Sequence, residues 1–563
     1  MHHQHRARHR GRLAGRRRDR HQRGLVRSAA PRGGRRRPLP GERRRRPRGH
    51  RRRAGRSGPA RDRDRRPGRG RRPLAGRGDR RRLHPAGRPD LDVLQHRRDR
   101  HPGRRRHRRA PGAGRGGGRG KSPPVVTPRS LRPQGDASDV VVIGGGVVGL
   151  STALHLRLGG AEVTLVEAGP IGAGASRRNA GWLVPSMCEP VPSPAGLRTA
   201  LRWLGRRGGP LKVGFEPSWS YLTFLTRMLL ASRTSPYQRG LAATAALASH
   251  AIDAFDELAA LGIEFERHRD GVLLLFVQEH GIQPHLDDLA AIERYGFPRA
   301  EALTGRDVRD LEPTVGPGVI GGILCPGDER VDPDSLTDAL AARCIEAGVR
   351  IRTDAPVTEI AAGRGGTTVV AGGVRHRSGS VVLAAGVGTR RLAAQLGIRV
   401  NIRAGKGYGF DYGPAPLGLR RAVYLSDHKV AVTPLDRGIR LAGTMEFGAE
   451  DLRVDERRAA AIPAAMAHYF PTWPASRPRP WTGLRPMTSD GLPVIGRVSP
   501  APVYVAAGHA MLGVTLGPLT GKLLSESILT GTEPALLRPF GLDRFQVLPH
   551  RDRSSVAEGV PWG

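Results

Sequence analysis

The sequence predicts an α/β fold, α+β overall, whose folded part begins only near Asp139. Two observations support this: a very basic first quarter that cannot form a core, and a strand–glycine–helix–strand unit directly after it. Two further strands that end in glycine follow at 381–386 and 503–508. Together they favour a layered domain with a parallel sheet that binds a nucleotide.

The first quarter of the chain carries nearly all of its net charge. Residues 1–130 contain 47 Lys and Arg against 8 Asp and Glu, and no Phe, Tyr or Trp. Residues 131–563 contain 47 basic and 42 acidic side chains. Because residues 1–130 have too little apolar surface to offset the entropy of ordering, we expect a disordered leader over 1–137. Residues 546–563 are expected to form a tail.

The arginine clusters of this leader, such as Arg43–Arg46, also suggest nucleic-acid binding. No aromatic residues accompany them to stack on bases, and no methionine occurs between Met1 and Met187. We therefore favour the hypothesis that the start site is over-extended and that the true start lies near Val125. A genuine basic tail is the second hypothesis. No nucleic-acid partner is expected, and a basic nucleic-acid-binding protein that carries a separate folded domain is a remote alternative.

Cysteine usage indicates a reduced compartment. Cys188, Cys325 and Cys344 are an odd number and show no metal-ligand spacing, so no metal site is expected. No run of 18 apolar residues and no secretory signal pattern is present. The expected location is cytoplasmic, with peripheral attachment to the inner face of the membrane as an alternative.

A strand–loop–helix–strand unit opens the folded part. Asp139–Ile143 is a β-branched run typical of a buried parallel strand. Apolar residues then recur at helical spacing until Gly159, and Glu162–Val166 predicts a second strand that ends in Glu167. A complete unit of this kind within 30 residues is a strong indication of dinucleotide binding, whereas a lone glycine pattern is weak.

The loop of this unit has a glycine wherever the backbone must come close to a neighbour. Gly144 permits the tight turn, Gly146 lets a pyrophosphate approach, and Gly149 lets the helix pack on the strand. The helix N-terminus then offers N–H groups to the phosphate. Glu167, 18 residues after Gly149, can accept both ribose hydroxyls, which argues against a 2′-phosphate and hence against NADP.

The segments that follow favour FAD over NAD. A small polar loop, Ser176–Gly181, comes directly after the second strand. Far downstream, 381–386 forms a strand and turn, and 503–509 leads into a glycine-containing stretch at 511–517 and a helix from Pro518 to Glu526. A cofactor held at both ends of such a span must be long.

With these motifs, the chain resembles the D-amino-acid dehydrogenase branch of the amine-oxidising flavoproteins, which include D-amino-acid, glycine and sarcosine oxidases. The resemblance covers 138–545. The matching motifs are VVIGGGVVGL (141–150), S-x-x-NAG (176–181), LAAG (383–386), KGY (406–408), WTGLRPMTSDGLPVIG (481–496) and GH-x-x-LG (508–513).

The resemblance implies a Rossmann-like FAD domain built from separate segments and a substrate domain with a mixed or antiparallel sheet. The FAD domain would comprise 138–225, 327–403 and 481–545, and the substrate domain 226–326 and 404–480. The implied cofactor contacts are Gly144, Gly146, Val148, Gly149, Glu167, Ala168, Ser176, Asn179, Ala180, Gly181, Val357, Ala385, Gly386, Gly508, Met511, Gly513, Val514 and Thr515. No cysteine lies near Arg485 or His509 in the sequence, so non-covalent FAD is expected.

Within the substrate segments the pattern predicts several elements. Residues 240–262 predict one amphipathic helix, and 271–277 a buried strand. Residues 430–434 and 439–443 predict a hairpin. The apolar stretch Trp219–Leu230 is interpreted as a core or interdomain helix, with a membrane-touching patch as the alternative.

Oxidation of an amino acid requires a grip on its carboxylate, and Arg485 matches the family's carboxylate-binding arginine. A planar guanidinium can donate two charge-assisted bonds to a carboxylate. Tyr408 and His509 are expected to line the site, each with packing as the alternative role. The tyrosine that some relatives place near 429–432 is not evident, and Tyr424 is a candidate substitute. Ala510 stands where relatives often have glycine.

The implied reaction is oxidative deamination of a D-amino acid: hydride leaves Cα for flavin N5, and the imino acid hydrolyses to a 2-oxo acid and ammonia. Orientation and electrostatics would then carry most of the rate. The alternative is a glycine- or sarcosine-type oxidase, or an oxidase of another secondary amine. The partners expected are an amino acid or amine substrate and an electron acceptor, either a quinone or oxygen.

Overall fold

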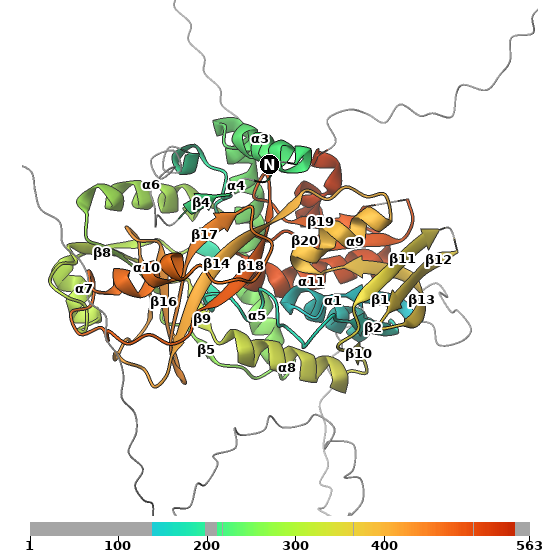
Figure 1. Cartoon of the computed structure of the whole chain (residues 1–563), viewed down its shortest axis with the longest axis horizontal. Coiled ribbons are helices and arrows are strands. Elements are labelled where there is room, and N and C mark those ends of the chain that lie inside the picture. The colour runs from blue at the N-terminus through green and yellow to red at the C-terminus, as the bar shows by residue number, and fades with distance from the viewer. Residues whose placement is uncertain are drawn as a thin grey trace, which may run out of the picture. The chain divides into compact units, whose positions relative to one another are not determined.

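The computed structural model describes residues 138–197, 211–214, 216, 218–363, 365–498 and 500–545, all within the compact unit Gly118–Gly563. The leader and the tail predicted at 1–137 and 546–563 lie outside the described residues. In Figure 1 the described part contains two large sheets, one around β1 and β13 and one around β14 and β17. This arrangement confirms the predicted mixed α/β class.

The first sheet has eight strands and a parallel centre. Strand β1 pairs in parallel with β2 and β13, and β13 pairs in parallel with β20. The order is β10-β2-β1-β13-β12-β11, with β20 beside β13 and β19 beside β20. The strands are β1 (Ser138–Ile143), β2 (Val163–Val166), β10 (Arg350–Arg352), β11 (Val357–Gly363), β12 (Gly366–Ala371), β13 (Val374–Leu383), β19 (Val494–Arg497) and β20 (Val503–Ala507).

Helices cover both faces of this sheet. On one face α1 packs against α11 and α8, and α5 packs against α11. On the other face α9 packs near β11 and β13. These helices are α1 (Val147–Leu158), α5 (Ala251–Ala260), α8 (Pro333–Glu346), α9 (Thr389–Gln395) and α11 (Gly513–Thr530). The helix predicted from Pro518 thus begins earlier, at Gly513, and Pro518 lies inside it.

The second sheet has nine strands and is mixed, as the resemblance implied. Its order is β18-β14-β17-β16-β15-β6-β8-β7, with β4 beside β17. The predicted strand at 271–277 and the predicted hairpin are both confirmed. The strands are β4 (Leu211–Val213), β6 (Val272–Phe276), β7 (Glu301–Thr304), β8 (Gly321–Cys325), β14 (Ile402–Tyr412), β15 (Ala422–Leu425), β16 (Val430–Leu435), β17 (Gly438–Phe447) and β18 (Trp481–Thr488).

The domain division stays a prediction, but two strands differ from it. Strands β4 and β18 pair with β17 and β14 in the second sheet, although 138–225 and 481–545 were assigned to the FAD domain. Hydrogen bonding between strands distant in sequence leaves no local signal of which sheet they join. A small third sheet joins β3 (Trp182–Leu183), β9 (Glu329–Val331) and β5 (Arg267–His268).

The helix predicted over 240–262 is two helices, α4 (Thr234–Ala248) and α5. The break falls at Ser249 and His250. The Ser249 hydroxyl donates to the Ala246 carbonyl, and the His250 amide bonds Leu247, three residues back instead of four. Side-chain competition for backbone carbonyls is a common cause of such breaks.

Helix α3 (Trp219–Ala231) has two apolar faces. Tyr221 and Phe224 are buried, whereas Trp219 is 85% exposed and Leu222 48% exposed. The interpretation as a core helix therefore holds for one face only. None of the helices in the described part has the length and apolar character needed to span a bilayer.

Cys188, Cys325 and Cys344 are buried, and none of them forms a disulfide. Burial raises the pKa of each thiol to about 12. These thiols therefore stay protonated at neutral pH.

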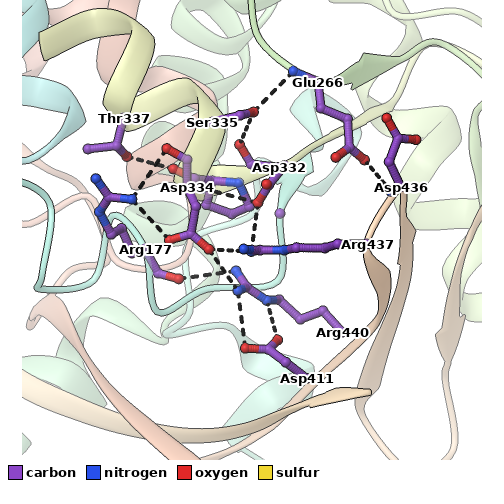
Figure 2. A network of polar contacts seen from close by, with 12 residues as sticks. Arg177, Glu266, Asp332, Asp334, Ser335, Thr337, Asp411, Asp436, Arg437 and Arg440 are labelled. Carbon is purple, nitrogen blue, oxygen red and sulfur yellow. Dashed lines mark hydrogen bonds and ion pairs between the residues drawn. The ribbon is translucent and has the colours of Figure 1, made fainter. Parts of the chain in front are cut away.

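A network of charged side chains joins the 176–181 loop, α8 and the second sheet (Figure 2). Asp334, in the first turn of α8, accepts from Arg177 at 3.2 Å, from Arg440 at 3.3 Å and from Arg437. Arg440 on β17 also donates to Asp411 on β14 at 2.7 Å and to the Arg177 carbonyl at 3.1 Å. The side chain of Arg440 is only 2% exposed, so its charge depends on these partners.

Replacing Asp334 with Asn should lower the free energy of unfolding by roughly 2 kcal/mol, between the values typical of exposed and buried pairs. Burial raises the pKa of Asp334, but Arg437, Arg440 and Arg177 outweigh burial and hold it below its usual value. The stabilisation is therefore present above about pH 4 and is lost as pH falls through the folded-state pKa.

Thermal melting between pH 3 and 7 measures this effect. Asp338→Asn is the matched control, because Asp338 also contacts Arg177 but its side chain is 70% exposed. Equal melting temperatures for the two variants at pH 7 would contradict the role given to Asp334.

Candidate active site

A single continuous cavity of about 2030 Å³ extends from the glycine loop of β1 to the second sheet. It begins at Ile143 and Gly144, passes the turns after β13 and β20, and reaches Arg485 on β18. The carboxyl ends of β1, β13 and β20 thus meet at one wall of the cavity, which is where parallel sheets bind nucleotides.

The glycine loop folds tightly under this wall. Gly144 has a φ of +116°, and a Cβ there would lie 2.7 Å from the Ala384 carbonyl carbon. The Glu167 carboxylate at the end of β2 accepts from the Gly145 amide at 2.6 Å and from the Gly169 amide at 3.2 Å. Glu167 therefore lies across the loop, where it can also reach ribose hydroxyls.

The 176–181 loop closes over the start of α1. The Ser176 hydroxyl accepts from the Val147 amide at 3.0 Å. The Asn179 amide donates to the carbonyls of Ala175 and Ser176, and its oxygen accepts from the Gly181 amide at 2.7 Å. These bonds give a small polar loop one defined shape beside the cavity.

Fourteen of the predicted cofactor residues line the cavity. All of them come from the first sheet, from α1 and α11, or from the loops that adjoin these elements: Gly144, Gly146, Val148, Glu167, Ala168, Ser176, Asn179, Ala180, Val357, Ala385, Gly386, Met511, Gly513 and Val514.

The other four predicted contacts do not line the cavity. Gly149 packs against Gly144, and Gly181, at a φ of +75°, packs against β9. Gly508 packs on Thr488, and the Thr515 hydroxyl is hydrogen-bonded to the backbone of Trp182 and Val184. These four residues support the fold around the cavity but do not line it.

The cavity fits FAD. At one end Gly144 and Gly146 line it next to the Glu167 carboxylate and the start of α1. At the other end it offers the backbone of 511–514 at the start of α11. An elongated dinucleotide needs such contacts at both ends, and the N-termini of α1 and α11 favour its phosphate and polar groups.

Arg485 faces the far part of the cavity from β18. Its Nη1 donates to the Thr444 carbonyl at 3.2 Å, and among the described residues no carboxylate forms an ion pair with it. Burial lowers its pKa to about 10, and the nearby Tyr424 hydroxyl partly offsets burial. The guanidinium is thus cationic at neutral pH and has donors left for an anion.

Glycines on β14 make room for Arg485. Gly407 lies opposite Gly483, and a Cβ at Gly407 would come within 2.7 Å of the Arg485 Cζ. Gly409 leaves space for the Trp481 ring in the same way. The KGY motif therefore contributes through its glycine, because a larger residue would displace the guanidinium.

Tyr408 does not line the cavity, contrary to the prediction. Side chains alternate along a strand, so Tyr408 points to the face opposite Gly407. Its side chain is fully buried there, and its hydroxyl donates to Glu446 at 2.8 Å.

His509 lines the cavity, as predicted, and is tied to the fold. It is 3% exposed, and its Nε2 pairs with the Thr520 hydroxyl on α11 at 3.1 Å. Burial lowers its pKa to about 4, so the ring is neutral at physiological pH. This hydrogen bond links the loop after β20 to α11.

Tyr424 on β15 also lines the cavity beside Arg485, as the candidate substitute for the missing tyrosine. Its ring packs edge-on against Trp182 at 5.7 Å between centroids. Burial raises the pKa of Tyr424 to about 12, although Arg485 lowers it, so the hydroxyl stays protonated and can donate.

Strained backbone concentrates at this cavity. Lys429, Thr444 and Ala510 line it and have φ values of 57°, 61° and 51°. Residues other than glycine rarely adopt these values, and such strain is often found at functional sites. The left-handed conformation at Ala510 explains why glycine would suit that position.

Several lining groups carried no signal in the sequence. Glu189, Asp288 and Lys429 come from three distant segments and meet at one side of the cavity. The buried polar atoms Ser426 Oγ, Thr444 Oγ1 and Trp481 Nε1 have no hydrogen-bond partner among the described residues. A ligand can satisfy such atoms.

One group of side chains outside the cavity has the spacing of metal ligands. Glu266, His268 and Asp436 bring ligand atoms within 4.8 Å of one another. Glu266 already contacts His268 at 3.1 Å. It also accepts from the Asp436 amide at 3.0 Å (Figure 2). These contacts account for the cluster, and we assign no metal to it.

Comparison with known proteins agrees with this geometry. Residues 139–527 match the family model described as FAD dependent oxidoreductase. A D-amino acid dehydrogenase from Methylobacterium sp. (strain 4-46) is 33% identical over 411 residues, which are 70% of this chain and 96% of that protein.

Solved structures share the fold. Glycine oxidase from Geobacillus kaustophilus is 26% identical with a TM-score of 0.55, over 72% of this chain and 99% of that one. L-proline dehydrogenase from P. horikoshii, at 20% identity and a TM-score of 0.57 over 73% of this chain and 98% of that one, shares the fold.

FAD is the cofactor that this family binds, and the cavity has the volume and the lining to hold it. The chain belongs to the FAD-dependent oxidoreductase family and is an oxidoreductase that acts on amino donors.

Proposed function

We propose that the chain catalyses the oxidative deamination of D-amino acids. The observation that carries this proposal is the Arg485 guanidinium, which lines the cavity without a carboxylate partner among the described residues. A buried cation of this kind is stabilised by a bound anion such as an amino-acid carboxylate. The D configuration is supported by the 33% identical relative that is named a D-amino acid dehydrogenase.

In this proposal the protein acts mainly by binding and orientation. Arg485 holds the carboxylate, and the Thr444 carbonyl fixes one edge of the guanidinium. The protonated Tyr424 hydroxyl next to Arg485 can donate a further bond to the carboxylate. Bound FAD supplies the acceptor for a hydride from Cα of the neutral amine. The resulting imino acid reacts with water to give a 2-oxo acid and ammonia.

The alternative is a glycine- or sarcosine-type oxidase, or an oxidase of another secondary amine. The 26% identical glycine oxidase supports it, since that protein shares the fold over nearly its whole length. Both reactions need the same carboxylate grip, so Arg485 does not distinguish them.

Location and electron acceptor are part of this proposal. The exposed Trp219, Leu222 and Leu230 on α3 favour peripheral contact with a membrane at its cytoplasmic face, where a quinone is available. Oxygen is the alternative acceptor. Co-sedimentation with lipid vesicles tests the proposed membrane contact. The rates at which a soluble quinone and oxygen reoxidise the reduced flavin compare the two acceptors.

Anaerobic reduction of the FAD-loaded protein tests the reaction. We expect D-alanine to bleach the flavin absorbance, and L-alanine to leave it unchanged. Bleaching by glycine or sarcosine alone would replace the proposal with its alternative.

Arg485→Ala should lower kcat/KM by roughly 100-fold, about 3 kcal/mol, because the substrate carboxylate loses its charged partner. Near-normal turnover would remove Arg485 from this role.

Gly407→Ala should raise KM for the amino acid by about 10-fold or more, because the new methyl group displaces the Arg485 guanidinium. Steady-state kinetics with flavin content measured in parallel would show this. Gly418→Ala is the matched control, since a Cβ there meets nothing within 4 Å. Equal KM values for the two variants would show that β14 does not position Arg485.

A further inference from the structure

The cavity continues past Arg485 into a second polar region. We name this region the polar lobe and define it by Glu189, Asp288, Ser426 and Lys429, which all line the cavity. Glu189 follows a short 3-10 helix, η2 (Pro185–Met187), and Asp288 lies on α6 (Ile282–Ile292). Ser426 and Lys429 lie in the turn between β15 and β16.

Tyr424 connects the polar lobe to Arg485. The Lys429 ammonium lies 5.6 Å from the centroid of the Tyr424 ring. Tyr424 in turn interacts electrostatically with Arg485. A molecule whose carboxylate is bound at Arg485 therefore has the polar lobe as its neighbour on the Tyr424 side.

The charges of the polar lobe are not paired. Among the described residues, Glu189, Asp288 and Lys429 have no ion-pair partner within 4 Å. Burial, and after it the nearby Asp288 carboxylate, raises the pKa of Glu189 to about 7, while Tyr237 and Lys429 partly oppose them. A carboxylate in this environment gains a cation favourably.

The Ser426 hydroxyl within the polar lobe has no hydrogen-bond partner among the described residues. Ser426 is 3% exposed and lines the cavity. The left-handed backbone of Lys429 lies three residues away. A buried hydroxyl without a partner and local strain are independent indications of a site built for a ligand.

We propose that the polar lobe binds a cationic side chain of the substrate, an ω-amine or guanidinium, through Glu189 and Asp288. This inference rests on the proposed function, because it names the class of amino acid whose carboxylate binds Arg485. Glu189 and Asp288 supply the negative charge, and Ser426 supplies a neutral hydrogen-bond acceptor.

The balance of charge decides between a cationic and an anionic side chain. Three carboxylates line this part of the cavity, Glu189, Asp288 and Asp427, against the single ammonium of Lys429. Burial lowers the pKa of Lys429, and the nearby Asp427 and Glu189 carboxylates only partly oppose this effect. A cationic side chain restores the balance, whereas an anionic one adds a fourth negative charge.

Binding of unreactive analogues tests the polar lobe independently of the reaction. 6-Aminohexanoate and hexanoate both carry the carboxylate for Arg485 and differ in the terminal amine. With the full-length, FAD-loaded protein, calorimetry should give a Kd for 6-aminohexanoate at least 10-fold below that for hexanoate. Equal affinities would overturn the inference.

Substrate selectivity provides the second test. D-Lysine and D-norleucine have side chains of similar length, and the ratio of their kcat/KM values should favour D-lysine at least 10-fold. Glu189→Gln and Asp288→Asn should each reduce this ratio several-fold. Asp287→Asn is the matched control, because Asp287 neighbours Asp288 on α6 but does not line the cavity, and it should leave the ratio unchanged.

The outcomes separate the two proposals. Oxidation of D-norleucine at a rate equal to that of D-lysine would overturn this inference and leave the proposed function standing. A preference for D-glutamate would also overturn it and would assign Lys429 as an anion site. Tighter binding of 6-aminohexanoate without reduction by any D-amino acid would support the polar lobe and refute the proposed function.

Discussion

The buried positive charge of Arg485 is the constraint on which the far half of the cavity depends. Removing a guanidinium from water is costly unless protein groups or a ligand replace its hydration. The Thr444 carbonyl replaces one contact, at the cost of a β-branched residue in the left-handed region. The remaining donors face the cavity. In the proposed function, a substrate carboxylate would bind these donors and so stabilise Arg485.

Placing that charge depends on the pleat of the second sheet. Arg485 and Trp481 on β18 lie over β14, where Gly407 and Gly409 leave the space they need. Because the strand alternates, Tyr408 is directed to the opposite face and binds Glu446. One short segment thus opens the site on one face and anchors the core on the other, and it can do so only because its small and large residues alternate.

The parts of the site that depend on local sequence could be predicted. The glycine loop, Glu167 and the 176–181 loop form within about 40 residues, so motif and periodicity suffice. The fold class followed from the same unit. Gly149 has the packing role that was predicted for it, but it does not line the cavity as was also expected. Gly508 was expected to touch the cofactor, yet it serves close packing, since the same residue type meets either requirement. The break at Ser249 depends on one side-chain hydrogen bond, which periodicity does not reveal.

The parts that tertiary structure assembles could not be predicted in the same way. Glu189, Asp288 and Lys429 are separated by about 100 residues or more and meet only because η2, α6 and the β15–β16 turn border one cavity. Tyr424 interacts electrostatically with Arg485 across the cavity, although the two are 61 positions apart in the chain and lie on strands that do not pair with each other. Each residue type is unremarkable alone, and its role arises from the neighbours that folding supplies.

The two charged ends of the far cavity bear on stereochemistry. A chiral amino acid has four different groups on Cα. A site that binds only the carboxylate leaves the rest of the molecule free to rotate. A cation at Arg485 and carboxylates at Glu189 and Asp288 would fix two of the four groups and define a direction between them. Exchanging enantiomers then exchanges the positions of the amine and the hydrogen. Since only the hydrogen can leave as hydride, a second attachment point converts a general carboxylate grip into a choice between enantiomers.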